Sequence, residues 1–595
     1  MSEASTWRAV GRCGAALLLL AAAAVPLSAA DALPGDWYEA KSDHFVIVGN
    51  AGEKRLRATA IHFEQVRAHF LDVAPLLARS AARPLPIFVA RDRRTMKLFM
   101  PSLFEDRGRA PVAGRFVDLS MMQFVQLQAD ASEIWREQVV AHEYFHYLVN
   151  RMATRLPVWL DEGLAEFWGA TQFTADSRVV GRLIEERLAW VRNRPLLPLD
   201  RLFAVDRSSA EYRGVDLAPR FYAQSWALVH FLTLGKQGAR EAELRNYLRL
   251  IAEKVDPVAA GKQAFGDLRA LERELVAYLQ LRLFPLGEMK AVAAPDPARI
   301  TVRRLRPAEA ASAVAMPLLH TEPPARARPL VDAARAAEPE LVSARLAQAT
   351  LAIRERRFEA ASAEFEAIRL SGTTDPLALY GAAVTRLFRG ADARGLDESE
   401  RDLRSALAID PDFTAAKARL ADTLVRKGGD VREALELLRS ARRVRPSDAV
   451  LALREVEILS RAGRDAESSD TLMRLIDGAL GSGSASYMNN LCWYGALSGL
   501  AAAVMPLCDR SLELVPEAAS ALDSRGVARA LAGDVSGAIA DLKAAVAAAG
   551  ETWSEAQIAR RRAWIEALGA GGSPFDENML LELRFAPEES GGWGY

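Results

Sequence analysis

Cysteine and histidine are scarce in this chain of 595 residues, which holds three Cys and seven His. So few cysteines exclude a scaffold built on many disulfides. The formal net charge of -1 provides no excess of positive charge to attract nucleic acid, and we expect none as a partner. With 50% apolar and 26% charged residues, the composition is that of a globular protein, and the length predicts several domains.

A long apolar run occurs at the N-terminus, from Ala15 to Val25. It follows Arg8 and Arg12 and precedes the small residues Ser28-Ala29-Ala30, which is typical of a secretory signal peptide at 1–30. An uncleaved anchor is the alternative, although the run is short and rich in alanine for a membrane span. No later stretch is long and apolar enough to cross a bilayer, so we expect an exported mature chain, periplasmic or extracellular, with no membrane span.

The stretch Val140-Ala-His-Glu-Tyr-Phe-His-Tyr147 contains an H-E-x-x-H sequence formed by His142, Glu143 and His146. On a helix, residues four apart share one face, so the two imidazoles can point at one metal ion with the glutamate beside them. The alternative is that both histidines continue an apolar stripe and only form hydrogen bonds. Because two of the seven histidines flank a glutamate at this spacing, we favour the metal site.

Strand and helix patterns alternate before this motif. We expect strands at His44–Val48 and Pro86–Ala90, with a helix at Arg55–Val73 between them. Val112–Leu127 predicts further strand. An exposed sheet edge can bind a peptide as an added strand, so Phe116–Leu127 is a candidate surface for a protein or peptide substrate, with an ordinary strand of the sheet as the alternative.

Two helices are expected around the motif. Asp130 and Glu133 resemble a capping box, which predicts that the metal helix begins there and continues to about residue 151. Pro157 is placed to open the next helix. On that helix Glu162 and Glu166 share a face opposite the apolar stripe.

His142-Glu-x-x-His146 followed by Leu156-Pro-x-Trp-Leu-x-Glu-Gly-Leu-Ala-Glu166 resembles the gluzincin zinc metallopeptidases. The resemblance is to the peptidase-MA-like domains of bacterial proteins, which often also carry tetratricopeptide repeats. It is sharp over these residues and looser across residues 36–285. It implies an α+β zincin-like fold at 31–285, a Zn²⁺ cofactor, Glu162 as the third metal ligand and Glu166 as a carboxylate that orients a ligating histidine. Asp161 or Glu166 are the alternative third ligands.

Two histidines and one glutamate suit a catalytic zinc, which takes three protein ligands and leaves a position for water. Glu143 would then be the general base. The segment Phe221–Leu232 resembles the helix that follows the ligands in these domains. That resemblance makes Tyr222 the candidate donor to the oxyanion of the intermediate, with His230, two turns further along, as the alternative.

The composition changes after residue 285. The stretch 286–340 is rich in Pro, Ala and Arg, so we expect a linker there, with His320 exposed in it. From about residue 341 the chain becomes rich in Ala and Leu and repeats at a period of 34. Four small or apolar residues are followed 34 positions later by four others, namely Cys492, Gly499, Val504 and Ser511 by Gly526, Gly533, Ala538 and Ala545.

This period predicts an all-α solenoid of about six tetratricopeptide repeats at 341–550, followed by a capping helix and tail at 551–595. A generic helical bundle rich in alanine is the alternative. In this register Cys492 and Cys508 lie on the two helices of one repeat, which leaves a disulfide between them geometrically open. Stacked repeats form a concave surface that commonly binds extended peptides or proteins, so a protein partner is expected on the solenoid.

Together these features predict an exported zinc metallopeptidase, with a repeat array that recruits a substrate or partner. The rival is a scaffold or adaptor of the cell envelope whose peptidase domain is catalytically silent. The base, both histidines, a third carboxylate and a candidate tyrosine are all present, which is more than a scaffold requires. A structural zinc site is less favoured, because such sites usually use four protein ligands.

Overall fold

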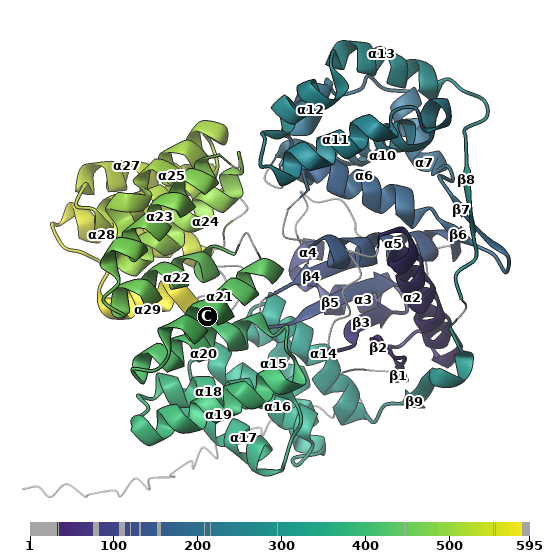
Figure 1. Ribbon diagram of the computed structural model, residues 1–595. Coiled ribbons are helices and arrows are strands. Elements are labelled where there is room, and N and C mark those ends of the chain that lie inside the picture. Colours follow the sequence, from purple (N-terminus) through teal and green to yellow (C-terminus); the bar gives the residue numbers. More distant parts are fainter. Residues whose placement is uncertain are drawn as a thin grey trace, which may run out of the picture.

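The computed structural model describes residues 33–585, apart from 34, 75–82, 106–113, 120, 130–132, 151–155, 207–208, 215, 294, 446–447, 482, 551–552 and 554. The expected signal peptide, the expected helix cap at Asp130 and the end of the expected tail therefore lie outside the described residues. Figure 1 shows the arrangement of the rest. A mixed sheet with its helices and a helical lobe lie on one side, and a long helical array lies on the other.

The larger sheet has six strands in the order β4-β5-β3-β2-β1-β9, so β4 and β9 are its edges. β2 and β3 run parallel, as do β3 and β5, and the remaining neighbours pair antiparallel. The strands are β1 (Tyr38–Lys41), β2 (Phe45–Gly49), β3 (Leu85–Ala90), β4 (Gly114–Asp118), β5 (Gln123–Gln128) and β9 (Thr301–Arg304). Since β5 lies between β4 and β3, only the β4 part of the expected edge Phe116–Leu127 is an edge.

Helices cover both faces of this sheet. Successive side chains of a strand point to opposite faces, so neighbouring residues of one strand pack into different clusters. Ile87 on β3 packs into a cluster with α2 (Glu53–Val73) and α5 (Glu133–Asn150). The next residue, Phe88, packs on the other face with α3 (Arg93–Phe99) and with helices from beyond residue 300. The short α4 (Pro101–Glu105) follows α3 directly.

A helical lobe follows the metal helix, with a core that contains the buried rings of Trp159, Phe203, Trp226 and Tyr247. A small sheet of β6 (Gln172–Phe173), β7 (Ser177–Val180) and β8 (Gly287–Lys290) lies at its side. The helices of the lobe are α6 (Val158–Gly169), α7 (Glu185–Arg192), α8 (Leu199–Ala204), α9 (Ala210–Arg213), α10 (Ala218–Leu234), η1 (Gly235–Gly238), α11 (Glu241–Ala252), α12 (Pro257–Phe265) and α13 (Leu268–Leu279).

The segment 286–340 is not the linker that its composition predicts. It contributes β8 and β9 to the two sheets, then a short turn η2 (Pro297–Arg299) and the helices α14 (Pro307–Thr321) and α15 (Pro324–Ala337). Its prolines misled the prediction because several stand in the first turn of a helix, where the missing N–H costs nothing. His320, expected to be exposed, is buried on α14.

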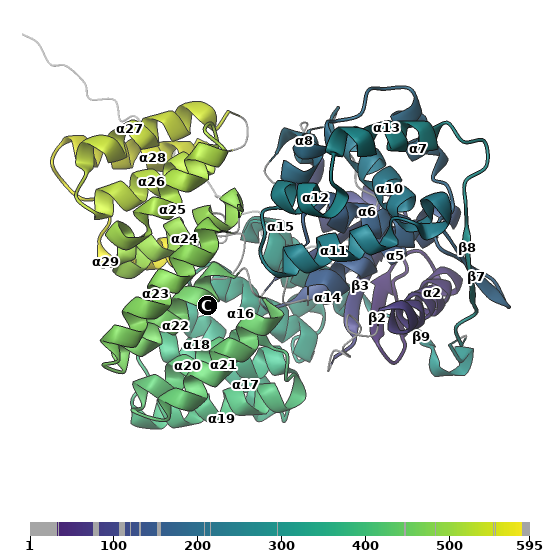
Figure 2. The same cartoon turned by 45° about the horizontal axis from the view of Figure 1, so that its top comes forward.

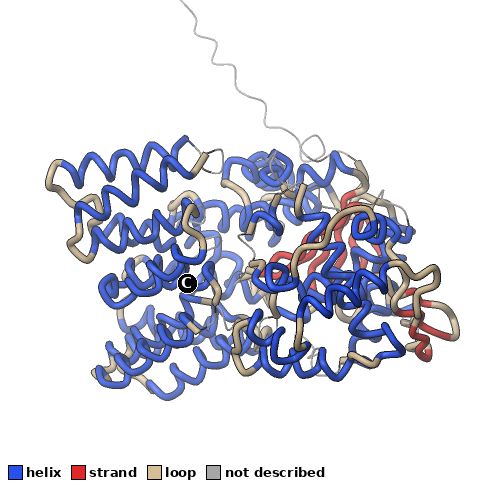
Figure 3. The backbone as a smooth tube through the Cα atoms, turned by 90° about the horizontal axis from the view of Figure 1, so that it is seen from above, coloured by secondary structure: helices blue, strands red, loops and turns tan. Residues whose placement is uncertain are grey.

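Six antiparallel helix pairs follow between residues 342 and 548, as the period of 34 predicts. The chain is therefore a mixed α/β region followed by a long helical array of the tetratricopeptide type, with the strands confined to one side of the molecule (Figure 3). The pairs are α16 (Val342–Arg354) and α17 (Phe358–Leu370), α18 (Pro376–Phe388) and α19 (Ala393–Ile409), α20 (Thr414–Arg426) and α21 (Val431–Val444), α22 (Ala449–Arg461) and α23 (Asp465–Leu480), α24 (Ala485–Gly495) and α25 (Ala501–Leu514), and α26 (Ala519–Leu531) and α27 (Val535–Ala548).

The array is joined to the sheet and closed at its other end by buried contacts. Ala344 and Leu351 of α16 share a core with Phe88 of β3, together with α14 and α15. At the far end, α28 (Glu555–Gly569) packs against the last pair, and α29 (Glu577–Phe585) contacts η3 within the same buried cluster. Figure 2 shows α28 against α26 and α27 in this part of the molecule.

Contrary to the expectation from the sequence, residues 485–514 form a 30-residue helical stretch that is long and apolar enough to cross a membrane, and 56% of its most apolar window is buried within the fold. The stretch is not straight. Gly499 has φ 81°, a left-handed conformation that turns the chain at η3 (Ala496–Leu500). A disulfide between Cys492 and Cys508, whose Cα atoms are 5.2 Å apart, joins α24 to α25. The stretch is therefore a folded-back helix pair.

We expect this disulfide to stabilise the array. Closing a loop of 16 residues should contribute about 3 kcal/mol. The double variant Cys492→Ala/Cys508→Ala should therefore unfold at a lower urea concentration than the unaltered protein. A reductant added during unfolding should lower the midpoint of the unaltered protein only, and equal midpoints for all samples would contradict the prediction.

Candidate metal centre

The predicted ligands stand on two helices that pack closely. Gly169, at the end of α6, allows this approach, because a Cβ atom there would lie 3.0 Å from the carbonyl oxygen of Gln138 on α5. On its other side α6 lies against α10, where a Cβ on Gly163 would come within 2.6 Å of the carbonyl oxygen of Ser225. The two glycines thus let α6 lie between its neighbours and present Glu162 to α5.

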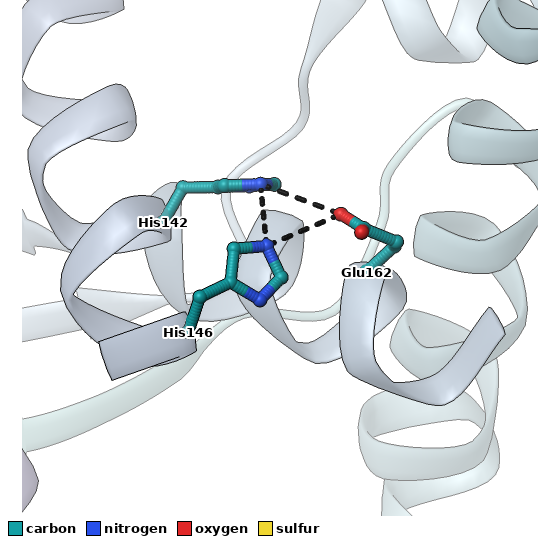
Figure 4. Close-up of side chains that lie close together, drawn as sticks. All are labelled: His142, His146 and Glu162. Atoms are coloured by element: carbon teal, nitrogen blue, oxygen red, sulfur yellow. Dashed lines mark hydrogen bonds and ion pairs between the residues drawn. The ribbon is translucent and has the colours of Figure 1, made fainter. Parts of the chain in front are cut away.

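The side chains of His142, His146 and Glu162 converge on one point (Figure 4). The two Nε2 atoms of the histidines are 3.0 Å apart, and Oε2 of Glu162 lies 3.5 Å from Nε2 of His142 and 3.3 Å from Nε2 of His146. Four ligands bound tetrahedrally to zinc at about 2.0–2.1 Å would lie roughly 3.3–3.4 Å apart. The three atoms thus fit a metal ion of this size, and each is of a type that zinc binds.

Burial sets the environment of these ligands. The side chain of Glu162 is 2% exposed, whereas those of His142 and His146 are 17% and 11% exposed. The second oxygen of Glu162, Oε1, accepts a hydrogen bond of 3.1 Å from the hydroxyl of Tyr212. This leaves Oε2 directed at the histidines.

Asp161 orients one ligand. Its Oδ1 lies 3.0 Å from Nδ1 of His146. Because a carboxylate only accepts, Nδ1 carries the proton, and Nε2 is the nitrogen that can bind a metal. Such outer carboxylates fix the ring of a ligating histidine, and here that contact comes from Asp161 instead of the expected Glu166.

The charges of these ligands shift the pKa values of one another. Burial opposes the charged form of His146, but Asp161 and Glu162 outweigh it and raise the pKa of this ring well above 6.5. Burial would raise the pKa of Glu162, but the two histidines hold that pKa well below 4.5. Burial also lowers the pKa of His142, but the hydrogen bond to Glu162 raises it, and the net pKa lies above 6.5. Without a metal, protons thus balance the buried carboxylate.

Glu143, the predicted base, follows His142 on α5, is buried, and contacts the sheet edge. Its Oε2 accepts a hydrogen bond of 2.5 Å from the backbone N–H of Phe116 on β4. This contact points outward from β4 and uses a backbone group that an added peptide strand would need. The edge expected to bind substrate is therefore partly engaged by Glu143.

The expected oxyanion donor Tyr222 lies beside Tyr212, and their ring centroids are 6.0 Å apart. Burial, followed by the charge of Glu162, raises the pKa of Tyr222 well above 10, so its hydroxyl stays protonated. Arg187 lies over the ring of Tyr222 and donates a hydrogen bond of 2.7 Å to Oε1 of Glu166. Glu166 therefore has an arginine partner.

His230 does not serve as the alternative donor in this structure. Its Nδ1 lies 2.7 Å from the hydroxyl of Tyr278, and its Nε2 lies 2.8 Å from the carbonyl oxygen of Gly181. Both ring nitrogens are engaged, and burial lowers the pKa of the ring. His230 is thus a core residue with satisfied hydrogen bonds.

Comparison with known proteins matches one segment of the chain to a family. Residues 131–259, which include the triad, match a family described as "Protein of unknown function (DUF1570)". No curated protein matches the chain.

Solved structures with similar helical repeats match the chain at low identity. A tetratricopeptide repeat protein from Parabacteroides merdae is 16% identical, with a TM-score of 0.26, over 41% of this chain and 92% of that one. YrrB, described as a TPR protein with an unusual peptide-binding site, is 15% identical, with a TM-score of 0.19, over 39% of this chain and 97% of that one. A chain of the Cut9-Hcn1 complex is 13% identical, with a TM-score of 0.27, over 62% of this chain and 68% of that one.

Two contacts of the centre were missed in the sequence. Tyr212 lies on the four-residue helix α9, in a segment without a motif, and its spacing from Glu162 carries no local signal. The contact from Phe116 to Glu143 uses a backbone group, so no side-chain pattern could indicate it. The role of Asp161 had a signal in its position next to Glu162, but the helix register alone did not favour it over Glu166.

We expect metal binding to release protons. The raised pKa of His146 means that its ring is protonated near pH 7 without metal, and the proton on Nε2 must leave when a metal binds. Affinity for Zn²⁺ should thus increase with pH. Calorimetric titration in two buffers of different ionisation enthalpy should give at least one proton released per ion.

The same shift has a consequence for the metal-free protein. The folded pKa of His146 lies above its unfolded value, so its contribution to stability is fully present below about pH 6.5 and is lost as the pH rises through the raised value. Thermal unfolding of the metal-free protein between pH 6 and pH 9 should show this loss. In the calorimetric titration, a Zn²⁺-binding enthalpy that does not depend on the buffer would contradict the release of protons from the ligands.

Proposed function

We propose that the mixed α/β region and its helical lobe form a zinc-dependent peptidase. The observation that carries the proposal is the convergence of the ligand atoms of His142, His146 and Glu162, with Glu143 next to His142 on the same helix. The resemblance to gluzincins over residues 142–166 supports the same reaction. When bound, zinc would acidify a water molecule and polarise the scissile carbonyl.

Each neighbouring residue has a task in this reaction. Phe116 holds Oε2 of Glu143, so we assign Oε1 to accept the proton of the attacking water. Asp161 keeps Nε2 of His146 directed at the metal position, and Tyr212 does the same for Oε2 of Glu162. Tyr222, kept protonated by burial, would donate to the oxyanion of the intermediate.

We further propose an exported location and a protein-binding role for the array. The disulfide between Cys492 and Cys508 supports the location, since disulfides persist in compartments that are not reducing. The signal-peptide pattern at 1–30 supports it independently. The six helix pairs support a role in recruiting a protein substrate or partner, as in other solenoids.

The test is cleavage of an unfolded, fluorophore-labelled casein by the mature protein. We expect cleavage by protein loaded with Zn²⁺, loss of cleavage after removal of the metal with a chelator, and recovery when Zn²⁺ is added back. Equal cleavage by the chelated protein would exclude the zinc mechanism. Stoichiometric zinc without cleavage would instead favour a scaffold with a silent peptidase domain.

A further inference from the structure

The helical array contacts the strand that borders the candidate metal centre. Nη1 of Arg445, which follows α21, lies 3.2 Å from Oδ1 of Asp118, the last residue of β4. The two side chains are 16% and 12% exposed, so this ion pair is largely shielded from water. Two further contacts brace it, because Arg445 also pairs with Asp448 and Asp118 accepts a hydrogen bond of 2.7 Å from Gln123.

An apolar contact lies beside this ion pair. Met121, in the connection between β4 and β5, packs against the buried cluster of the array that includes Phe413 and Leu451. The end of the β4–β5 hairpin is therefore held by the array through both charge and packing, and the two residues of the ion pair are 327 positions apart in sequence.

The other end of the same strand lies against the metal helix. A Cβ on Gly114 would lie 2.3 Å from Cγ1 of Val139 and 3.1 Å from Cγ of Glu143, so the backbone of β4 packs directly against side chains of α5. Phe116, which donates to Glu143, is two residues from Asp118, a distance of about 7 Å along a strand. One five-residue edge strand thus connects the array to Glu143.

We propose that Asp118 and Arg445 are positioning residues for Glu143. By fixing the end of β4, the ion pair holds the Phe116 N–H against the carboxylate, and this makes the array a structural part of the centre as well as a recruiting surface. β4 needs such support because β5 pairs with it on one side only. The catalytic consequence rests on the proposed peptidase function, whereas the structural consequence does not.

The structural part is tested by amide hydrogen exchange of the segment 114–118. Asp118→Asn keeps an acceptor for Gln123 but removes the charge, and Arg445→Gln removes the other partner. Either variant should accelerate exchange of this segment about ten-fold, as expected for the loss of a charge-assisted hydrogen bond. The double variant should add little, and Arg445→Lys should restore protection.

A matched control breaks another ion pair of the array. Arg404→Gln removes the pair with Glu433, which joins α19 to α21, and should leave exchange at 114–118 unchanged. If Asp118→Asn and Arg445→Gln also leave it unchanged, the inference is overturned, whatever the activity.

The catalytic part is tested on the zinc-loaded protein. Both variants should lower kcat about ten-fold with little change in KM, zinc content or Tm, because Glu143 is displaced while the ligands stay in place. A change in KM or in Tm alone would show a merely structural contact and would overturn the positioning role. If the two variants exchange faster at 114–118 but the unaltered chain cleaves no casein, the peptidase function is refuted and the structural link stays intact.

Discussion

Replacing Glu143 by glutamine is expected to lower kcat by about 10²–10⁴-fold while zinc content stays the same. The glutamine side chain keeps an oxygen that can accept the hydrogen bond from the Phe116 N–H, so β4 should remain in place. An amide cannot take a proton from the attacking water. Because Glu143 is not one of the three converging ligands, the metal should bind as before.

Two measurements separate this outcome from loss of folding. Bound zinc is measured by atomic absorption, and the initial rate of casein cleavage is compared at equal zinc occupancy. Glu241→Gln removes the same charge from an exposed position of α11 and should retain full activity. A Glu143→Gln protein that cleaves at the rate of the unaltered chain would exclude Glu143 as the base.

Much of the fold could be predicted because the signals are local. The helix periodicity around His142 and Pro157 matches α5 and α6, and the period of 34 matches the six helix pairs. β1 and β9 could not be predicted in the same way. Thr301–Arg304 is short and mostly charged or polar, and it becomes a strand only by pairing with Tyr38–Lys41, more than 250 residues away.

The residues of the candidate metal centre also differ in whether local sequence predicts their positions. His142 and His146 come from one helix, so their spacing is sufficient to predict that they meet. The choice between Asp161 and Glu166 depends on how α6 is rotated against α5, which small residues such as Gly169 allow and no periodicity specifies. Tyr212 comes from a separate short helix and is placed by the packing of the whole lobe.

The rotation of α6 also makes the third ligand testable, and we expect opposite results from two glutamates one turn apart. Glu162→Gln should weaken Zn²⁺ binding by more than the roughly 10–100-fold typical of losing an outer partner, because it removes a ligand atom and a buried negative charge. Asp161→Asn should fall within that range, since it affects only the orientation of His146. Glu166→Gln should leave zinc affinity nearly unchanged, because its carboxylate pairs with Arg187.

Competition with a chromophoric zinc chelator measures all three affinities at one pH. That condition matters because the protons on His142 and His146 compete with the metal. The order of the losses carries the assignment. If Glu166→Gln lost more affinity than Glu162→Gln, the ligand would be Glu166, and α6 would have to rotate by about 40° and shift by about 6 Å along its axis from its observed position, the offsets between residues four apart. If all three variants bound Zn²⁺ like the unaltered protein, the ion would be held elsewhere in the chain. The converging atoms would then hold only protons, and the proposed peptidase site would contain no zinc.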